Sequence, residues 1–379
     1  MRSLLLCCTL CVVSSVALAD DEVVLTRGSS TLKATIGGEV FTVYRFGEDL
    51  PKPYLFPVTA PGAWELLAAA EPGDETVAGR RAMICSEEVG SGDGKLTFGA
   101  LVTIDKVDGE KAHVAGSDLW IQRSDAAPLA GTVTRVVDLD PPKIKDRRDP
   151  RYYDHPHHKG VWLSVDEVNG IKFWNEDGRI VSHKVEVLTA RGNPAVFCRV
   201  NHWLDTDGKP LVQETSVISL YANRLLTCDV RFEAIEKEVT FGDTKEGMFA
   251  IRLPNSMREF ISESPVVNAD GLSGTKACWG LESNWIDYTG KIDGELFGVT
   301  LMDHPENLWR SRYHVRDYGL FAINPFGAKA YSGGKEPDQP LTLKPGAAGA
   351  RFRYGLYVHR GSLDDGHVAD RYKQFVTAE

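Results

Sequence analysis

The amino-acid sequence predicts an all-β fold, a large antiparallel β-sandwich with few short helices. Short apolar segments, many of them alternating, recur at intervals of about 8–12 residues with turn residues between them. No apolar pattern with the helical period runs beyond about three turns. Neither an internal repeat nor a linker interrupts the series, so we expect residues 20–379 to form a single β-sandwich domain.

The first half of the chain predicts short strands joined by tight turns. Two alternating runs around the Gly37-Gly38 pair predict a hairpin within residues 22–46. Several prolines between residues 51 and 61 predict an extended, non-helical passage. Residues 63–70 predict a short helical turn and residues 71–94 a loop. Further strands are expected over residues 96–105, 111–114, 119–122 and 132–137.

The second half predicts longer strands and one terminal helix. The turn residues 205–208 (Asp-Thr-Asp-Gly) separate two of these strands. An alternating strand is expected within residues 350–359 and a helix over residues 364–375. The remaining strands are expected over residues 180–188, 195–204, 210–220, 225–234 and 238–241.

The N-terminus has the features of a secretory signal over residues 1–19. Arg2 precedes an apolar core, and Ala17-Leu18-Ala19 matches a cleavage site. No later stretch approaches the roughly 18 apolar residues that span a bilayer, so we expect an exported protein, periplasmic or secreted. The net charge of −10 excludes ordinary nucleic-acid binding. Export permits up to two disulfides among the remaining cysteines, with no pairing indicated: Cys85, Cys198, Cys228 and Cys278.

The first candidate site is a cluster of imidazoles. Residues 154–162, DHPHHKGVW, place His155, His157 and His158 within four positions. Pro156 disfavours a helical His155, so we expect an extended segment there. The Asn169-Gly170 pair that follows predicts a tight type I′ hairpin turn. Histidine ligates metals and transfers protons near neutral pH, so the cluster indicates a site carried on a rigid loop.

The second candidate site is the loop that follows the strand ending at residue 241. Asp243, Lys245 and Glu246 lie between two glycines in the run FGDTKEGMF, residues 241–249. A carboxylate and an ammonium group at the end of a strand suit general acid–base catalysis. The alternative is a solvated loop with a surface ion pair.

The third candidate site lies between residues 278 and 327. It contains three of the eight tryptophans, and indole rings either stack on sugars or fill a core. Arg316 has the planar fork that binds carboxylates or neighbouring hydroxyl groups, although Asp317 beside it could be its partner. Other polar candidates in this stretch are His304, His314 and Asn324.

Four stretches together resemble an uncharacterised bacterial family, a domain of unknown function often labelled "methane oxygenase PmoA". They are DHPHHKGVWLSVDEVNGIKFW, FGDTKEGMFAIRLP, WIDYTG and HVRDYGLFAINPFG, and the resemblance runs from about Pro53 to Gly361. The closing section also resembles the galactose-mutarotase-like super-sandwich. That resemblance implies a histidine acid and a carboxylate base acting on a sugar ring. The late glutamate of mutarotases has no clear counterpart, and Asn324 or Asp317 stands nearest.

These observations favour an exported enzyme that performs acid–base chemistry on a sugar or related small molecule or oligosaccharide. Epimerase, lyase and hydrolase chemistry all remain open. A divalent-metal enzyme using His155 and His157 is one alternative, and a non-catalytic sugar-binding module is another; the cofactor is otherwise unknown. The catalytic candidates are His155, His157, His158, Glu246 and Asp317. The substrate-binding candidates are Lys159, Trp162, Asp243, Lys245, Trp285, His304, His314, Arg316 and Asn324.

Overall fold

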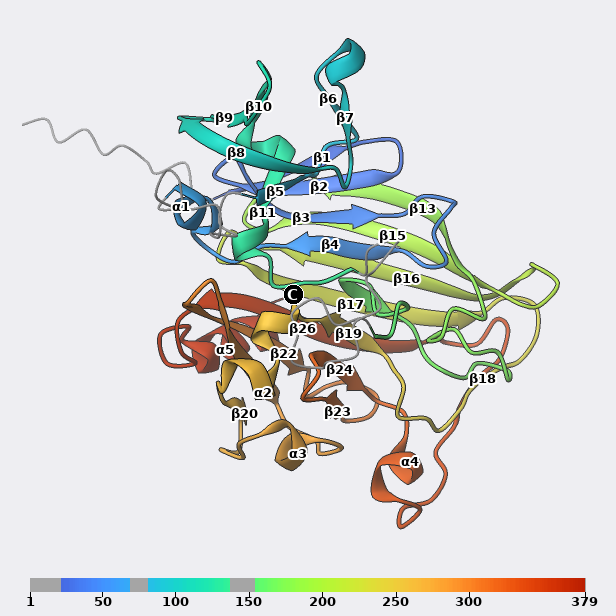
Figure 1. Cartoon of the computed structure of the whole chain (residues 1–379). Coiled ribbons are helices and arrows are strands. Elements are labelled where there is room, and N and C mark those ends of the chain that lie inside the picture. Colours follow the sequence, from blue (N-terminus) through green and yellow to red (C-terminus); the bar gives the residue numbers. More distant parts are fainter. Residues whose placement is uncertain (1–21, 69–80, 137–153, 379) are drawn as a thin grey trace, which may run out of the picture.

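The predicted all-β sandwich is confirmed. The computed structural model describes residues 22–68, 81–136 and 154–378, and most of its elements are antiparallel strands (Figure 1). Two large sheets stack against each other, and a smaller sheet lies at the upper end of the view. The expected signal segment, residues 1–19, lies outside the described residues. The single-domain organisation stays a prediction.

The first large sheet has nine strands and carries the candidate site. Its interior strand β12 pairs on one side with β4 and on the other with β19. Its strands in spatial order are β14 (Arg191–Gly192), β1 (Val23–Arg27), β2 (Thr31–Ile36), β3 (Glu39–Arg45), β4 (Tyr54–Val58), β12 (Val161–Leu163), β19 (Phe249–Arg252), β24 (Leu320–Asn324) and β23 (Arg312–Val315).

The second large sheet has eight strands, and three long neighbouring strands within it alternate buried residues with partly or fully exposed ones. In the strand over Ala195–Leu204, every second side chain is buried, as its sequence predicts. The strands in spatial order are β13 (Ile180–Thr189), β15 (Ala195–Leu204), β16 (Pro210–Leu220), β17 (Leu225–Ala234), β26 (Ala350–Arg360), β22 (Glu295–Asp303), β21 (Trp285–Ile292) and β20 (Val266–Asn268).

The smaller elements surround the sandwich. A five-stranded sheet has its own buried cluster, closed by Trp64 and Leu67 of α1 (Ala63–Ala68). Its strands are β10 (Trp120–Gln122), β9 (Lys111–Val114), β8 (Leu101–Asp108), β5 (Arg81–Ile84) and β11 (Ala126–Pro128). Two short pairs are β18 (Val239–Phe241) with β25 (Leu341–Leu343) and β6 (Glu88–Val89) with β7 (Leu96–Thr97). The other helices are α2 (Glu259–Ser262), α3 (Thr275–Cys278), α4 (Ala328–Ser332) and α5 (Val368–Thr377).

The main core lies between the two large sheets. Val161, Phe249 and Phe321 from the first sheet share one buried cluster with Trp203 and Phe352 from the second. Burial of such large apolar side chains stabilises each by about 1.5–3 kcal/mol. The helices in the described part of the chain are too short and polar to span a membrane. Its four cysteines, Cys85, Cys198, Cys228 and Cys278, are free thiols.

Several local predictions are confirmed because short-range turn chemistry decides them. Asn169 and Gly170 both have positive φ, as a type I′ turn requires, and the backbone groups of Val168 and Ile171 hydrogen-bond each other. Gly37 and Gly38 likewise both have positive φ between β2 and β3. The terminal helix is α5.

Two local predictions are wrong. The run from Thr132 is not a strand: it makes one isolated bridge to Thr59, and the Thr134 hydroxyl group accepts the hydrogen bond from the Val58 amide. A side chain therefore replaces part of the expected backbone ladder. Within the expected loop over residues 71–94, Arg81–Ile84 forms β5, which pairs with β8 and β11. Nonlocal pairing creates this strand.

Candidate active site

Loops from both ends of four neighbouring antiparallel strands meet over the outer face of the sheet. Strands β12, β19, β24 and β23 are consecutive in the nine-stranded sheet. The loops before β12, before β19 and between β23 and β24 meet around a cavity of about 460 Å³, a volume in the range of small-molecule sites. The cavity is lined by Asp154, His155, Lys245, Glu246, His314, Arg316 and Tyr318. Sequence segments more than 150 residues apart therefore form one site.

The outer face of the sheet leaves room for these loops. Trp162 pairs with Ala250, which pairs with Ala322, and Ala322 pairs with His314. Alanine has no side-chain atoms beyond Cβ. In this row of four paired residues, only the two outer ones, Trp162 and His314, therefore carry rings. Tyr318 packs against the buried cluster that contains Trp162 and the two alanines.

The histidine segment is a turn rather than an extended strand, so the expectation for His155 is wrong. His155 has a φ of 46°, and its carbonyl oxygen accepts a hydrogen bond from the His158 amide at 2.9 Å. Pro156 suits the second position of such a turn. The His155 ring stacks between His158, at 4.8 Å, and Tyr318, at 5.0 Å. The positive φ of His155, which the local sequence disfavours, thus occurs together with stacking of its ring on His158 and Tyr318.

His158 supports the turn from beneath. Its side chain is buried, and its ring stacks on Trp162 at 5.2 Å. Arg252 Nη1 lies 3.2 Å from His158 Nδ1. Because a guanidinium group only donates, Nδ1 accepts and the imidazole proton lies on Nε2. Burial, followed by the Arg252 charge, holds the pKa of His158 well below its usual value. A neutral, buried His158 therefore positions the other rings.

Arg252 also binds Asp154 at the wall of the cavity. Burial raises the pKa of Asp154, but the hydrogen bond from His155 and the charge of Arg252 outweigh it and hold the pKa at about 2. His155 Nδ1 lies 3.5 Å from Asp154 Oδ1. Asp154 is thus a fixed anion that orients the partly exposed His155 ring.

Lys159 and His157 belong to a support beside the turn. Lys159 Nζ contacts both carboxylate oxygens of Glu176, at 2.5 and 2.6 Å. The buried Lys52 binds the same carboxylate at 2.9 Å and the His157 carbonyl oxygen at 2.8 Å. Burial, with the Lys52 charge, lowers the pKa of His157 to about 4. Neither Lys159 nor His157 lines the cavity.

The turn also removes the geometric basis of the expected metal pair. The rings of His155 and His157 meet edge to face, with centroids 5.7 Å apart, rather than lying on one side of an extended strand. Within residues 22–68, 81–136 and 154–378, no group of three His, Cys, Asp or Glu side chains is arranged to hold a metal ion.

His314 is a neutral imidazole in the wall opposite the turn. Its Nδ1 lies 3.0 Å from the Lys245 carbonyl oxygen and 3.4 Å from Glu246 Oε2. A carbonyl oxygen can only accept, so Nδ1 carries the proton and Nε2 keeps its lone pair. Burial, followed by the Arg316 charge, lowers the pKa of His314 to about 3.

Glu246 has the opposite perturbation. Burial raises the pKa of its carboxyl group, and nearby Asp166 raises it further, while Lys245 and Arg316 oppose the shift. The Glu246 carbonyl oxygen accepts a hydrogen bond from the Asp166 amide at 2.7 Å, which fixes this part of the loop. A carboxyl group with a raised pKa beside a neutral imidazole is an arrangement suited to proton transfer.

Two of the expected substrate-binding side chains hold the Glu246 loop instead. Asp243 accepts hydrogen bonds from the backbone amides of Lys329 and Ala330, at 3.0 and 2.9 Å, at the start of α4. Asn324 donates to the Thr244 carbonyl oxygen at 2.8 Å and accepts from the Phe326 amide. Both side chains therefore hold the loop, and neither of them lines the cavity.

Four other candidates do not line the cavity. Trp162 is buried under His158, and Trp285 packs with the buried cluster beneath α5. His304 is buried beside α5, with Nε2 3.3 Å from the Val376 carbonyl oxygen. Asp317 lines a neighbouring hollow with Trp279. Sequence reasoning missed Tyr318, although it lies within the HVRDYG motif beside Arg316.

The low pKa of His314 predicts a loss of stability in acid. The unfolded chain protonates this imidazole below about pH 6.5, whereas the folded chain does so only near pH 3. Between these pH values the unfolded state binds more protons than the folded state. The free energy of unfolding therefore decreases as the pH is lowered, by at most about 1.4 kcal/mol per pH unit. His314→Asn keeps a donor for the Lys245 carbonyl oxygen and removes the titration.

Urea unfolding at several pH values tests this expectation. The wild-type protein should lose more stability than His314→Asn between pH 6 and 4, because the other titrating groups remain in both proteins. Parallel stability profiles for the two proteins would contradict the neutral, buried state of His314.

The fold and the cavity define an all-β sandwich protein with a polar cavity over the outer face of its nine-stranded sheet. The chain belongs to a family of unknown function, DUF6807, which matches residues 127–373. This range includes every residue that lines the cavity. The expected membership of an uncharacterised family is confirmed, and the description of the family carries no PmoA label.

Comparisons with other known proteins give only distant likenesses. No curated protein sequence matches significantly. Among solved structures, a beta-arabinopyranosidase is 12% identical over 54% of this chain and 32% of its own, with a TM-score of 0.26. The chain thus spans about a third of that protein's length. A galactose 1-epimerase from Lactobacillus acidophilus NCFM is 9% identical over 90% of this chain and 99% of its own, with a TM-score of 0.28. At these scores, neither likeness carries an argument about activity.

Proposed function

We propose that the protein is an exported enzyme that performs acid–base chemistry on a sugar or sugar derivative. The observation that carries this proposal is the meeting of Glu246, His314 and His155 in one polar cavity. The pKa of Glu246 is raised by burial and that of His314 is lowered by burial. Groups whose pKa values are pushed toward opposite protonation states are typical of acid–base sites.

Each side chain has a role that its surroundings support. Glu246 exchanges a proton with the substrate because its raised pKa brings it closer to neutral pH. His155, partly exposed and held by Asp154, is the second proton-transfer group. His314 Nε2 accepts a hydrogen bond from a substrate hydroxyl group. Tyr318 holds the His155 ring in place by stacking on it.

A polyhydroxy substrate suits this lining. Carboxylates and the His314 Nε2 atom accept hydrogen bonds, while the Lys245 and Arg316 side chains donate them. The hydroxyl groups around a sugar ring both donate and accept hydrogen bonds. A sugar can therefore bond to the donors and to the acceptors of this lining. Epimerisation, elimination and hydrolysis each need one proton donor and one acceptor, so the pair Glu246 and His155 serves any of them.

A proton NMR screen in D2O tests the proposal and separates these reactions. Neutral sugars, sugar acids and their methyl glycosides are incubated with the mature protein. Exchange of a ring proton indicates epimerisation, an alkene signal indicates elimination, and a new anomeric signal indicates hydrolysis. We expect one of these changes, and we expect it to be lost in His155→Asn. No change in any sugar, or full turnover by His155→Asn, would contradict the proposal.

A further inference from the structure

Cations around the candidate site differ in whether they have a carboxylate partner. Four of them are paired: Lys52 and Lys159 with Glu176, Arg252 with Asp154, and Arg312 with Glu336. Lys245 and Arg316 line the cavity, and neither has a carboxylate within ion-pair distance among the residues that the structure describes. Lys245 and Arg316, the two cations without such a partner, are therefore the ones that line the cavity.

The backbone of both cations is fixed, although no carboxylate of the described residues pairs with their charged ends. The Lys245 carbonyl oxygen accepts hydrogen bonds from His314 Nδ1, at 3.0 Å, and from the Tyr331 hydroxyl group, at 2.7 Å. Arg316 forms a tight turn with Leu320 and Gly319, with backbone hydrogen bonds of 2.8 and 3.1 Å. A fixed backbone reduces the entropy lost when these side chains bind a ligand.

The charges at the cavity do not balance internally. The single negative charge of Asp154 is already matched by the buried Arg252, and neither Lys245 nor Arg316 lies within ion-pair distance of it. Glu246 is the other carboxylate in the lining, and it faces both Lys245 and Arg316. Among the described residues, the cavity lining together with Arg252 thus has three cations and two carboxylates, in a chain whose net charge is −10. One negative charge on a ligand restores the balance.

We propose that the substrate is a sugar acid, such as a uronic acid, and that Arg316 and Lys245 bind its carboxylate. This inference rests on the proposed function. The guanidinium fork of Arg316 matches the two oxygens of a carboxylate, and the Lys245 ammonium group adds a point charge. Because Lys245 precedes Glu246 directly, a carboxylate held there lies beside the proton-transfer group.

Calorimetric titration of the mature protein tests the inference. The probes are D-galacturonate and D-glucuronate, compared with D-galactose and D-glucose. We expect each uronate to bind at least about tenfold more tightly than its neutral counterpart, because hydrogen bonds between charged groups are stronger than those between neutral groups. Arg316→Gln and Lys245→Gln should each weaken uronate binding by about 10- to 100-fold and weaken binding of the neutral sugars much less, because glutamine still donates hydrogen bonds to hydroxyl groups.

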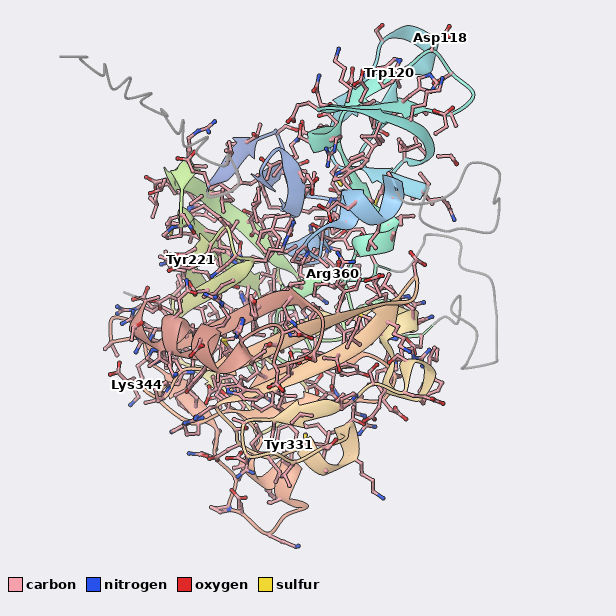
Figure 2. All side chains as sticks on the ribbon, turned by 90° about the vertical axis from the view of Figure 1, so that its left-hand side faces the viewer. Asp118, Trp120, Tyr221, Tyr331, Lys344 and Arg360 are labelled. Carbon is pink, nitrogen blue, oxygen red and sulfur yellow. The ribbon has the colours of Figure 1, made fainter. Side chains whose placement is uncertain are left out.

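The control variant is Lys106→Gln, which removes one exposed cation from the five-stranded sheet. Figure 2 places Trp120 of that sheet at one end of the molecule and Tyr331, which binds the Lys245 backbone, toward the other end. Lys106→Gln should keep the full preference for uronates. Equal binding of neutral and acidic sugars, absence of saturable uronate binding, or a preference that survives Arg316→Gln with Lys245→Gln would overturn the inference. Tighter binding of galactose 6-phosphate than of either uronate would overturn the choice of a carboxylate.

Turnover separates this inference from the proposed function. If the protein converts a neutral sugar, Glu246→Gln abolishes the conversion and uronates bind no more tightly than neutral sugars, the proposed function stands and the carboxylate inference fails. If uronates bind through Arg316 but no sugar is converted, the anion site stands and the proposed enzyme activity fails.

Discussion

Glu246→Gln is expected to lower kcat by about 100- to 10,000-fold, the usual contribution of a general acid or base. Glutamine has nearly the same shape but cannot exchange a proton. The side chain is partly exposed, and the backbone amide and carbonyl group of Glu246 hold the loop. The fold and the binding of sugar should therefore persist while turnover is lost.

Steady-state kinetics on the sugar found by the NMR screen measure this effect. Glu167→Gln is the matched control, because Glu167 is exposed, lies next to Asp166 and does not line the cavity. It should retain wild-type kcat and KM. A Glu246→Gln protein with a kcat within about threefold of the wild type would show that Glu246 does not transfer the proton.

Glu214→Ala is expected to lower the free energy of unfolding by about 3–5 kcal/mol, the cost of removing one partner of a buried ion pair. Glu214 is buried between the sheets, where its carboxylate binds Arg199 at 3.1 Å, Trp203 Nε1 at 3.1 Å and the Ser216 hydroxyl group at 2.9 Å. Alanine would leave the Arg199 charge uncompensated in the core and the polar groups around it without their acceptor.

Asp229→Ala is the matched control for this prediction. Asp229 lies on β17 and forms an ion pair with Arg351, which is 59% exposed. An exposed pair contributes about 0–1 kcal/mol, so Asp229→Ala should change the urea midpoint little. Equal losses of stability in the two variants would contradict a special role for the buried network.

The sequence was sufficient for the long strands and the hairpins because both depend on local patterns. The alternation in β15 and β16 matches their burial, and Asn169-Gly170 forms the turn that its residue types favour. The strand predicted from Thr132 does not form, because the Thr134 side chain takes over a backbone hydrogen bond. Local propensity contains no information on such a nonlocal contact.

The candidate site could be predicted as a set of residues but not as a geometry. His155, Glu246, His314 and Arg316 were selected from separate motifs, and the sheet order brings them together. Lys159 was selected on the same grounds, yet Glu176, seventeen positions away, binds it. Which cation has a carboxylate partner depends on tertiary contacts, so only the structure shows that no carboxylate of the described residues pairs with Arg316.

A crystal structure of Glu246→Gln with the sugar that the wild-type protein converts tests the central claim most directly. We predict the sugar in the cavity between the histidine turn and β23, within hydrogen-bond distance of residue 246 and His155 and with its charged group on Arg316. A sugar bound elsewhere, for example on the exposed face of the five-stranded sheet around Trp120, with the cavity empty, would contradict the account.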